Sequence, residues 1–185
     1  IYGTSETEKF DETSPPRLED FLSEVAAEWE RAADAIPAQR IVKLRTGVVL
    51  GREGGALPKM ALPYKLMVGG NIGNGRQPLS WIHIDDLARA IRFCIERTTI
   101  QGPVNATAPH PVTNREFGRA LGRALRRPHW LPLPGFALRA ALGEMAELLL
   151  KGQYVIPSVL LSHGFSFAYP EAGQALEQIY GSSRA

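Results

Sequence analysis

Apolar residues recur at three- and four-residue intervals in several stretches of the chain, a period typical of amphipathic helices. The first such stretch follows a polar loop over 4–16 and predicts a helix over 17–34. Thr113 and Glu116 have the spacing of a capping box, which predicts that another helix begins near Asn114. Further helices are expected around 59–67, after Asp85 and Asp86 as capping residues, over 135–151, within 157–163 and after Pro170.

Other stretches have the pattern of strands. Residues 40–51 pass from alternation to a continuous apolar run ending at Gly51, which predicts one buried parallel strand. Shorter strands are expected over 79–84 and 104–106, and the helix between them is expected to bury one face that carries Leu87, Ala90, Ile91, Cys94 and Ile95. This alternation of strands and helices indicates the α/β class.

Composition narrows the class of protein. Of the 185 residues, 44% are hydrophobic and 22% charged, which is typical of a soluble globular chain. The net charge of +2 comes from interspersed acids and bases, so we expect no nucleic-acid partner, and the arginines of 115–127 are interpreted as a solvated helix face. A lone Cys94 favours a reducing compartment, taken as the cytoplasm, and no apolar run reaches the roughly 18 residues of a membrane span.

Two motifs carry a family resemblance. "WIHIDDLARAI", residues 81–91, resembles the His-Val-x-Asp segment of extended short-chain dehydrogenases and nucleotide-sugar epimerases. By physics alone, Asp86 is expected to be a helix N-cap and His83 a half-buried strand residue. "VKLRTGVVLGREGGALPKM", residues 42–60, resembles the strand and loop that pass the nicotinamide end of the cofactor, so Arg45 is either a ligand contact or a structural ion-pair partner.

The resemblance continues through "SPP", "DFL", "GP.NATAP" and "LPLPGFALR" and covers essentially residues 1–181. The chain is identified as resembling the atypical extended short-chain dehydrogenases called epimerase family proteins, in their C-terminal portion. The resemblance implies that 1–107 hold the late strands and helices of a Rossmann-like NAD(P)-binding domain and that 108–185 form a mostly helical C-terminal domain.

The same resemblance implies a cofactor, NADP or NAD, bound mainly by an N-terminal half that we expect upstream of Ile1. Such a half would carry a glycine-rich strand-turn-helix that holds the dinucleotide pyrophosphate. The glycine cluster Gly69–Gly75 precedes a strand rather than following one, so it is not assigned to phosphate binding.

Working members of the superfamily use Tyr-x-x-x-Lys on a helix that resembles residues 17–34. The two possible registers place either Leu22 and Ala26 or Phe21 and Val25 at those positions, and neither pair can do acid-base work. Two functions therefore stay open. The first is an NADP(H)-dependent, nucleoside-diphosphate-sugar-epimerase-like oxidoreductase or isomerase that acts on an unknown small substrate. The alternative is a catalytically inactive dinucleotide-binding sensor or scaffold.

Six residues are expected around the ligand crevice at the carboxyl ends of the strands. Tyr2 is the candidate proton donor, or else an aromatic rim residue. The candidate cofactor contacts are Arg45 and Gly47, and the candidate substrate contacts are Met60, Gln77 and Trp81. Leu79 and Ser80 stand where nucleotide-sugar enzymes carry a diphosphate-binding arginine, which argues against a nucleotide sugar, and the histidines lack the spacing of a metal site.

The helix over 17–34 also suggests a partner. If it packs two subunits together, a homodimer forms through Phe21, Val25 and Trp29. The alternative is that the same apolar stripe packs on the protein's own sheet.

Overall fold

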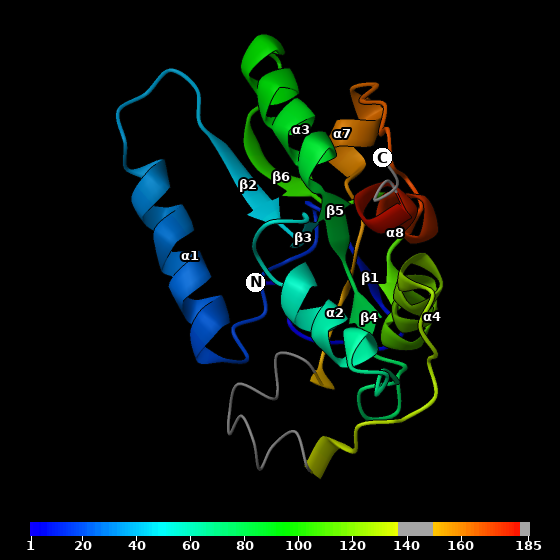
Figure 1. Cartoon of the computed structure of the whole chain (residues 1–185). Helices are drawn as coiled ribbons and strands as arrows, with labels where there is room; N and C mark the ends of the chain where they lie inside the picture. The colour runs from blue at the N-terminus through cyan, green and yellow to red at the C-terminus, as the bar shows by residue number, and fades with distance from the viewer. Residues whose placement is uncertain (137–149, 182–185) are drawn as a thin grey trace.

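A computed structural model describes residues 1–136 and 150–181 of the chain (Figure 1). The helix expected over 135–151 lies almost entirely outside the described residues. Helix α1, Phe21–Asp34, stands at one side of the molecule beside strand β2, and helices α4, Asn114–Leu125, and α8, Ala172–Gly181, lie at the other side. The molecule mixes helices with parallel strands, as the α/β prediction requires.

The strand expected over 40–51 is divided at Gly47 into β2, Val42–Thr46, and β3, Val48–Leu50. Strand β2 pairs in parallel with β6, Gly102–Ala106, whereas β3 pairs in parallel with β5, Trp81–His83. The N–H of Gly47 donates to the carbonyl of Ala106, and the next N–H, of Val48, donates to the carbonyl of Ser80. A Cβ at Gly47 would lie 2.8 Å from the Ser80 carbonyl oxygen, so only glycine fits where the strand changes partners.

Short strands extend this arrangement. Strand β1, Lys9–Phe10, pairs in parallel with β8, Tyr154–Val155, and β4, Pro78–Leu79, pairs antiparallel with β7, Val112–Thr113. The expected loop over 4–16 therefore contains a strand, which was missed because two residues are too few to show a period.

The helices follow their capping signals. Helix α1 begins at Phe21 rather than at residue 17, because the Asp20 carboxylate accepts the N–H of Ser23 and caps the helix there. The Thr113–Glu116 capping box is confirmed at the start of α4. The other expected helices are α2, Leu57–Lys65, α3, Ile84–Glu96, α7, Ser158–Ser162, and α8.

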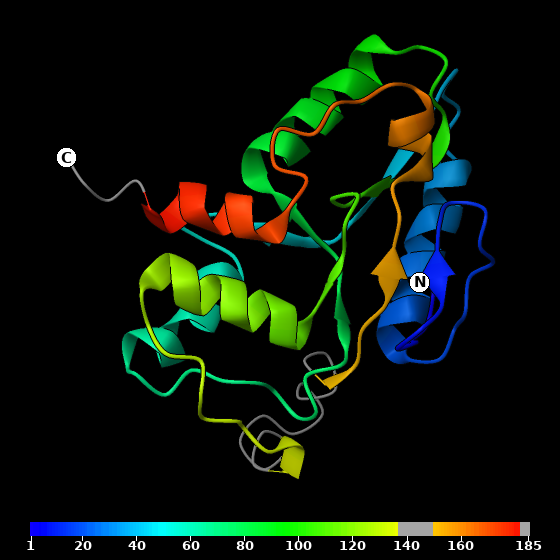
Figure 2. The same ribbon diagram turned by 90° about the vertical axis from the view of Figure 1, so that its right-hand side faces the viewer.

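The largest core lies between the β3–β5 pair and helices α2, α4 and α8, and it contains Leu50, Trp81, Phe117 and Leu176. Figure 2 shows α4 and α8 lying side by side over this core. Since its members come from both sides of residue 107, the two predicted segments share one hydrophobic interior. The division into two domains stays a prediction.

The buried face of α3 differs from the expectation. Asp86, Ala90 and Cys94 are buried, four residues apart, whereas Ile91 and Ile95 are exposed. The prediction was wrong for these two isoleucines because it placed apolar residues alone on the inner face of the helix, whereas that face also contains the buried carboxylate of Asp86.

Helix α1 leaves its apolar stripe uncovered. Phe21 is 75% exposed and Trp29 74%, while Ser23 is buried and Glu30 reaches β2. Within the described residues, Phe21 and Trp29 do not pack on the protein's strands, and both the homodimer and its alternative stay predictions.

Candidate functional site

Tyr2 and Arg45 form the centre of a polar network between α1 and the β2–β6 pair. The Arg45 guanidinium donates from Nη1 to the Tyr2 hydroxyl, with an N–O distance of 2.7 Å. It also donates from Nε and Nη2 to the two carboxylate oxygens of Glu30, at 2.6 and 2.7 Å. This bidentate pair joins α1 to β2, a geometry in which arginine cannot be exchanged for lysine without loss of a hydrogen bond.

The Tyr2 hydroxyl has a second partner. It donates to Oδ1 of Asn105, a residue of β6 with no exposed surface, over 2.7 Å. The Asn105 amide donates in turn to the carbonyl of Ile156, and the carboxylate of Glu12 accepts the backbone N–H groups of Asn105 and Val159. The network thus ties the first residues of the chain to β6 and α7.

Burial and charge set the protonation of this network. Burial raises the pKa of Tyr2, although the hydrogen bond from Arg45 opposes it, so the phenol is neutral near pH 7. The hydrogen bonds from Arg45 lower the pKa of Glu30, which is therefore ionised. The one proton of the Tyr2 hydroxyl is donated to Asn105, and a role as proton donor to a substrate would require that bond to break. That role stays a prediction.

The other predicted site residues lie apart from this network. Gly47 lies so close to the backbone of Ser80 that a Cβ would not fit between them. Trp81 is part of the main core and has no exposed surface, and Met60 packs against that core. Gln77 is buried and donates from Nε2 to the carbonyl of Ile72. The structure thus brings Tyr2 and Arg45 together and places Trp81 as a packing residue, while the ligand contacts proposed for the set stay predictions.

The His83–Asp86 segment corrects two expectations. The N-cap of α3 is His83, whose Nδ1 accepts the N–H of Asp85, and Asp86 lies inside the helix. Both side chains are buried, at 1% and 0% exposure, whereas the sequence predicted a half-buried histidine and a capping aspartate. The reason is tertiary: Asp86 accepts the N–H groups of Ala168 and Tyr169, and His83 contacts Gln178 and the ring of Tyr169.

Helix α1 offers no acid-base pair at the expected positions. Its residues Phe21–Asp34 include neither tyrosine nor lysine, and Phe21 and Leu22 are exposed apolar side chains. Within residues 1–136 and 150–181, no group of three His, Cys, Asp or Glu side chains could hold a metal ion. None of the helices described there is long and apolar enough to cross a membrane.

Sequence reasoning gave Glu12 and Asn105 no functional weight. Their sequence signals are weak, because Glu12 lies in a polar loop and Asn105 in a short apolar strand. An asparagine inside a buried strand was the one available signal, since a buried amide requires hydrogen-bond partners.

Comparisons with known proteins place the fold. The structure of Thermus thermophilus UDP-glucose 4-epimerase in complex with NAD superposes on all of this chain with a TM-score of 0.72 at 18% identity, and the chain covers 61% of it. At that identity the likeness concerns the fold, which is the Rossmann-like α/β fold of NAD(P)-binding short-chain dehydrogenases and epimerases.

Other known proteins are more similar in sequence. The epimerase family protein YfhF of Bacillus subtilis is 50% identical over 181 residues, which are 97% of this chain and 59% of YfhF. The crystal structure of the human epimerase family protein SDR39U1 (isoform 2) with NADPH has a TM-score of 0.92 and 42% identity over 98% of this chain and 62% of that one. Residues 133–179 match a family model described as a domain of unknown function, DUF1731. The chain is similar to the epimerase family proteins over nearly its whole length, and it spans about 60% of the length of these relatives.

Proposed function

We propose that the protein containing this chain is an NADP(H)-binding, epimerase-like oxidoreductase or isomerase that acts on a small substrate. The observation that supports this most is the likeness to a relative solved with NADPH, at 42% identity and a TM-score of 0.92. The nicotinamide would supply hydride transfer, and we expect most contacts to the cofactor phosphates to come from a segment outside these 185 residues.

The residues of this chain would support the cofactor rather than enclose it. Arg45 donates three hydrogen bonds to Glu30 and Tyr2, so its role under this proposal is to fix the end of β2 and the position of Tyr2. Gly47 would let the backbone pass close to Ser80 and Thr107 where β2 and β3 meet, since there is no room for a Cβ at this position. The wall of the substrate site would be supported by side chains that pack behind it, namely Met60, Gln77 and Trp81.

A second candidate function is a dinucleotide-binding sensor or scaffold without turnover. The absence of tyrosine and lysine from α1 favours it, because the usual proton-transfer pair has no counterpart there. Tyr2 offers a substitute only if its hydroxyl is released from Asn105.

A turnover experiment separates the two candidates. The complete gene product is incubated with NADPH and a panel of small carbonyl compounds, and nicotinamide absorbance is followed. The enzyme proposal predicts NADPH oxidation with at least one compound, and that rate should fall at least tenfold in Tyr2→Phe, a loss typical of removing a general acid. NADPH binding without oxidation of any compound would favour the sensor.

A control is needed because Tyr2→Phe also removes two hydrogen bonds. Asn105→Asp offers one, since it keeps an acceptor for the hydroxyl. Equal loss of rate in both variants, with equal loss of stability, would assign Tyr2 a structural role and contradict its assignment as proton donor.

A further inference from the structure

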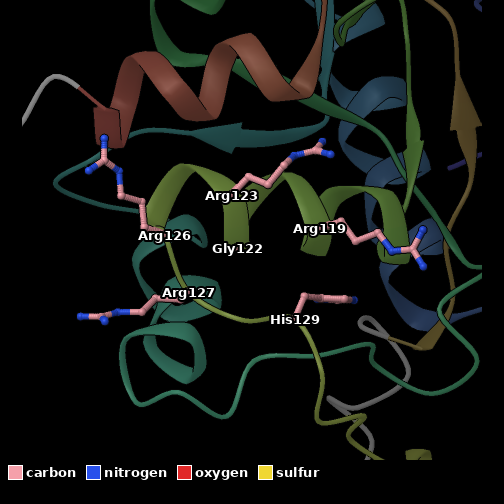
Figure 3. A pocket seen from close by; sticks show the side chains of 6 residues that line it. All are labelled: Arg119, Gly122, Arg123, Arg126, Arg127 and His129. Atoms are coloured by element: carbon pink, nitrogen blue, oxygen red, sulfur yellow. The ribbon is translucent and has the colours of Figure 1, made fainter.

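Two adjoining hollows lie where α4 ends. The first, of about 350 Å³, is lined by Arg119, Arg123, Arg127 and His129 among others (Figure 3). The second, of about 470 Å³, lies on the α8 side and is lined by Arg52, Lys65 and Tyr180. Because Arg126 lines both hollows, a single ligand could contact them together.

Cationic side chains are concentrated at this place. Among the residues that the structure describes, six lysines and arginines line the two hollows and no acidic side chain does, whereas the whole chain has a net charge of only +2. Within the described residues, none of the four arginines of α4 and its C-terminal end, numbers 119, 123, 126 and 127, forms an ion pair. Burial, with Arg119 and Arg115 contributing, lowers the pKa of His129, as expected in a positive field.

Tyr180 adds an unpaired hydrogen-bond donor to the second hollow. Its hydroxyl is shielded from solvent and has no hydrogen-bond partner within the described residues. Burial raises the pKa of this phenol, so the hydroxyl keeps its proton. The Lys65 ammonium lies 6.0 Å from the centre of the Tyr180 ring, which places a positive charge beside the unpaired group. The charged lining groups are donors only, so an acceptor-only anion would complement them.

The backbone of Arg126 is unusual. It caps α4 in the left-handed conformation, with φ 54° and ψ 44°, where glycine is favoured. Figure 3 shows its side chain extending from the end of α4 toward α8, while Arg119 and Arg127 point away in opposite directions. A side-chain role for Arg126 would account for an arginine at a position that glycine suits better.

We propose that the end of α4 binds a phosphate-bearing anion, with diphosphate as the minimal ligand, held by Arg126 between the two hollows and by the Tyr180 hydroxyl. Phosphate fits better than a single carboxylate because several guanidinium forks can each take two of its oxygens. This site lies outside the Tyr2–Arg45 network and does not depend on the proposed function. Free diphosphate and the diphosphate of a nucleotide share this chemistry.

The test is calorimetric titration of the complete gene product with sodium pyrophosphate, at low salt and again at about 0.2 M salt, where screening weakens exposed charges. Arg126→Gly removes the charge and suits the left-handed backbone, so the variant should fold at least as well as the original while binding about tenfold more weakly. Tyr180→Phe should weaken binding about fivefold, although it removes a buried unpaired polar atom and should not destabilise the fold.

Arg31→Ala is the matched control, because it removes one exposed positive charge from α1, far along the chain from α4. It should leave pyrophosphate binding unchanged. The proposal is overturned if pyrophosphate does not bind, if Arg31→Ala weakens binding as much as Arg126→Gly, or if Tyr180→Phe gains stability without losing affinity. Titration with ADP identifies the source: an affinity above that of pyrophosphate, lost in the same variants, would assign the site to a nucleotide.

Discussion

The carboxylate of Asp86 accepts the backbone N–H of Tyr169 over 2.8 Å, although the two residues are 83 positions apart in the chain. The same carboxylate accepts the N–H of Ala168 and pairs with Arg89. The motif that carries the family resemblance thus acts as a clamp that holds the segment leading into α8 against the start of α3.

Removing this clamp should be costly. We expect Asp86→Ala to lower the free energy of unfolding by about 3–5 kcal/mol, because two backbone N–H groups and Arg89 lose their partner. Urea denaturation measures this. Asp85→Ala, at an exposed neighbouring position, should cost about 1 kcal/mol or less, and similar losses in the two variants would contradict the clamp.

The Glu30–Arg45 pair predicts a pH dependence. The folded pKa of Glu30 is lowered from the ordinary value of 4.5, mainly by hydrogen bonds from Arg45. A carboxyl whose pKa is lowered by folding stabilises the protein above its unfolded pKa, and this contribution is lost as the pH falls through the folded value. The stability difference between the original protein and Glu30→Gln should therefore be constant from about pH 6 to 8 and shrink below about pH 4.5.

The exposed Glu28 is the control for this experiment, since its pair with Arg31 is open to solvent and should contribute little at any pH. If the difference in unfolding free energy between the original protein and Glu30→Gln stayed the same at acid pH, the charge of the Glu30 carboxylate would not be the source of the stabilisation.

Gly47 marks the point at which one strand changes partners. We expect Gly47→Ala to destabilise the fold by about 1–3 kcal/mol, because the added methyl group would press on the backbone of Ser80 and on Thr107. Gly54→Ala is the matched control, since nothing lies within 4 Å of its Cβ position. Thermal unfolding of both variants checks the expectation, and an unchanged transition for Gly47→Ala would contradict the requirement for glycine at the point where the strand changes partners.

The uncovered stripe of α1 supports the homodimer as a proposal. Phe21 and Trp29 are each about three-quarters exposed, and Val25 lies between them on the same face. Sedimentation velocity of the complete gene product should show a dimer that Phe21→Glu with Trp29→Glu converts to a monomer. Glu24→Lys is the control for a charge change on the same helix. A dimer that survives the double substitution would place the interface elsewhere.

The sequence predicted the local structure where local signals decide it. The capping box at Thr113 and Glu116 located the start of α4, and the apolar run over 40–51 located a buried parallel strand. The division of that strand at Gly47 could not be predicted, because it depends on which of two distant strands lies alongside.

The candidate site was predictable only in part. Tyr2 and Arg45 were both selected from the sequence, yet their contact through one hydroxyl depends on folding across 43 residues. Asp86 was taken as a cap because capping is the commonest local role of an aspartate near a helix start, and its true partners lie near the other end of the chain. Similarly, the spacing of the arginines of α4 predicted a helix. The hollow beside them could not be predicted, because it forms only where α8 brings Tyr180 next to α4.

The most direct test of the account is titration of the complete gene product with NADPH and with NADH, followed by nicotinamide fluorescence. We predict saturable binding of NADPH, the nucleotide present in the structure of the human relative. Failure of both nucleotides to bind would contradict the proposed function, leaving a protein that has the Rossmann-like fold without the cofactor.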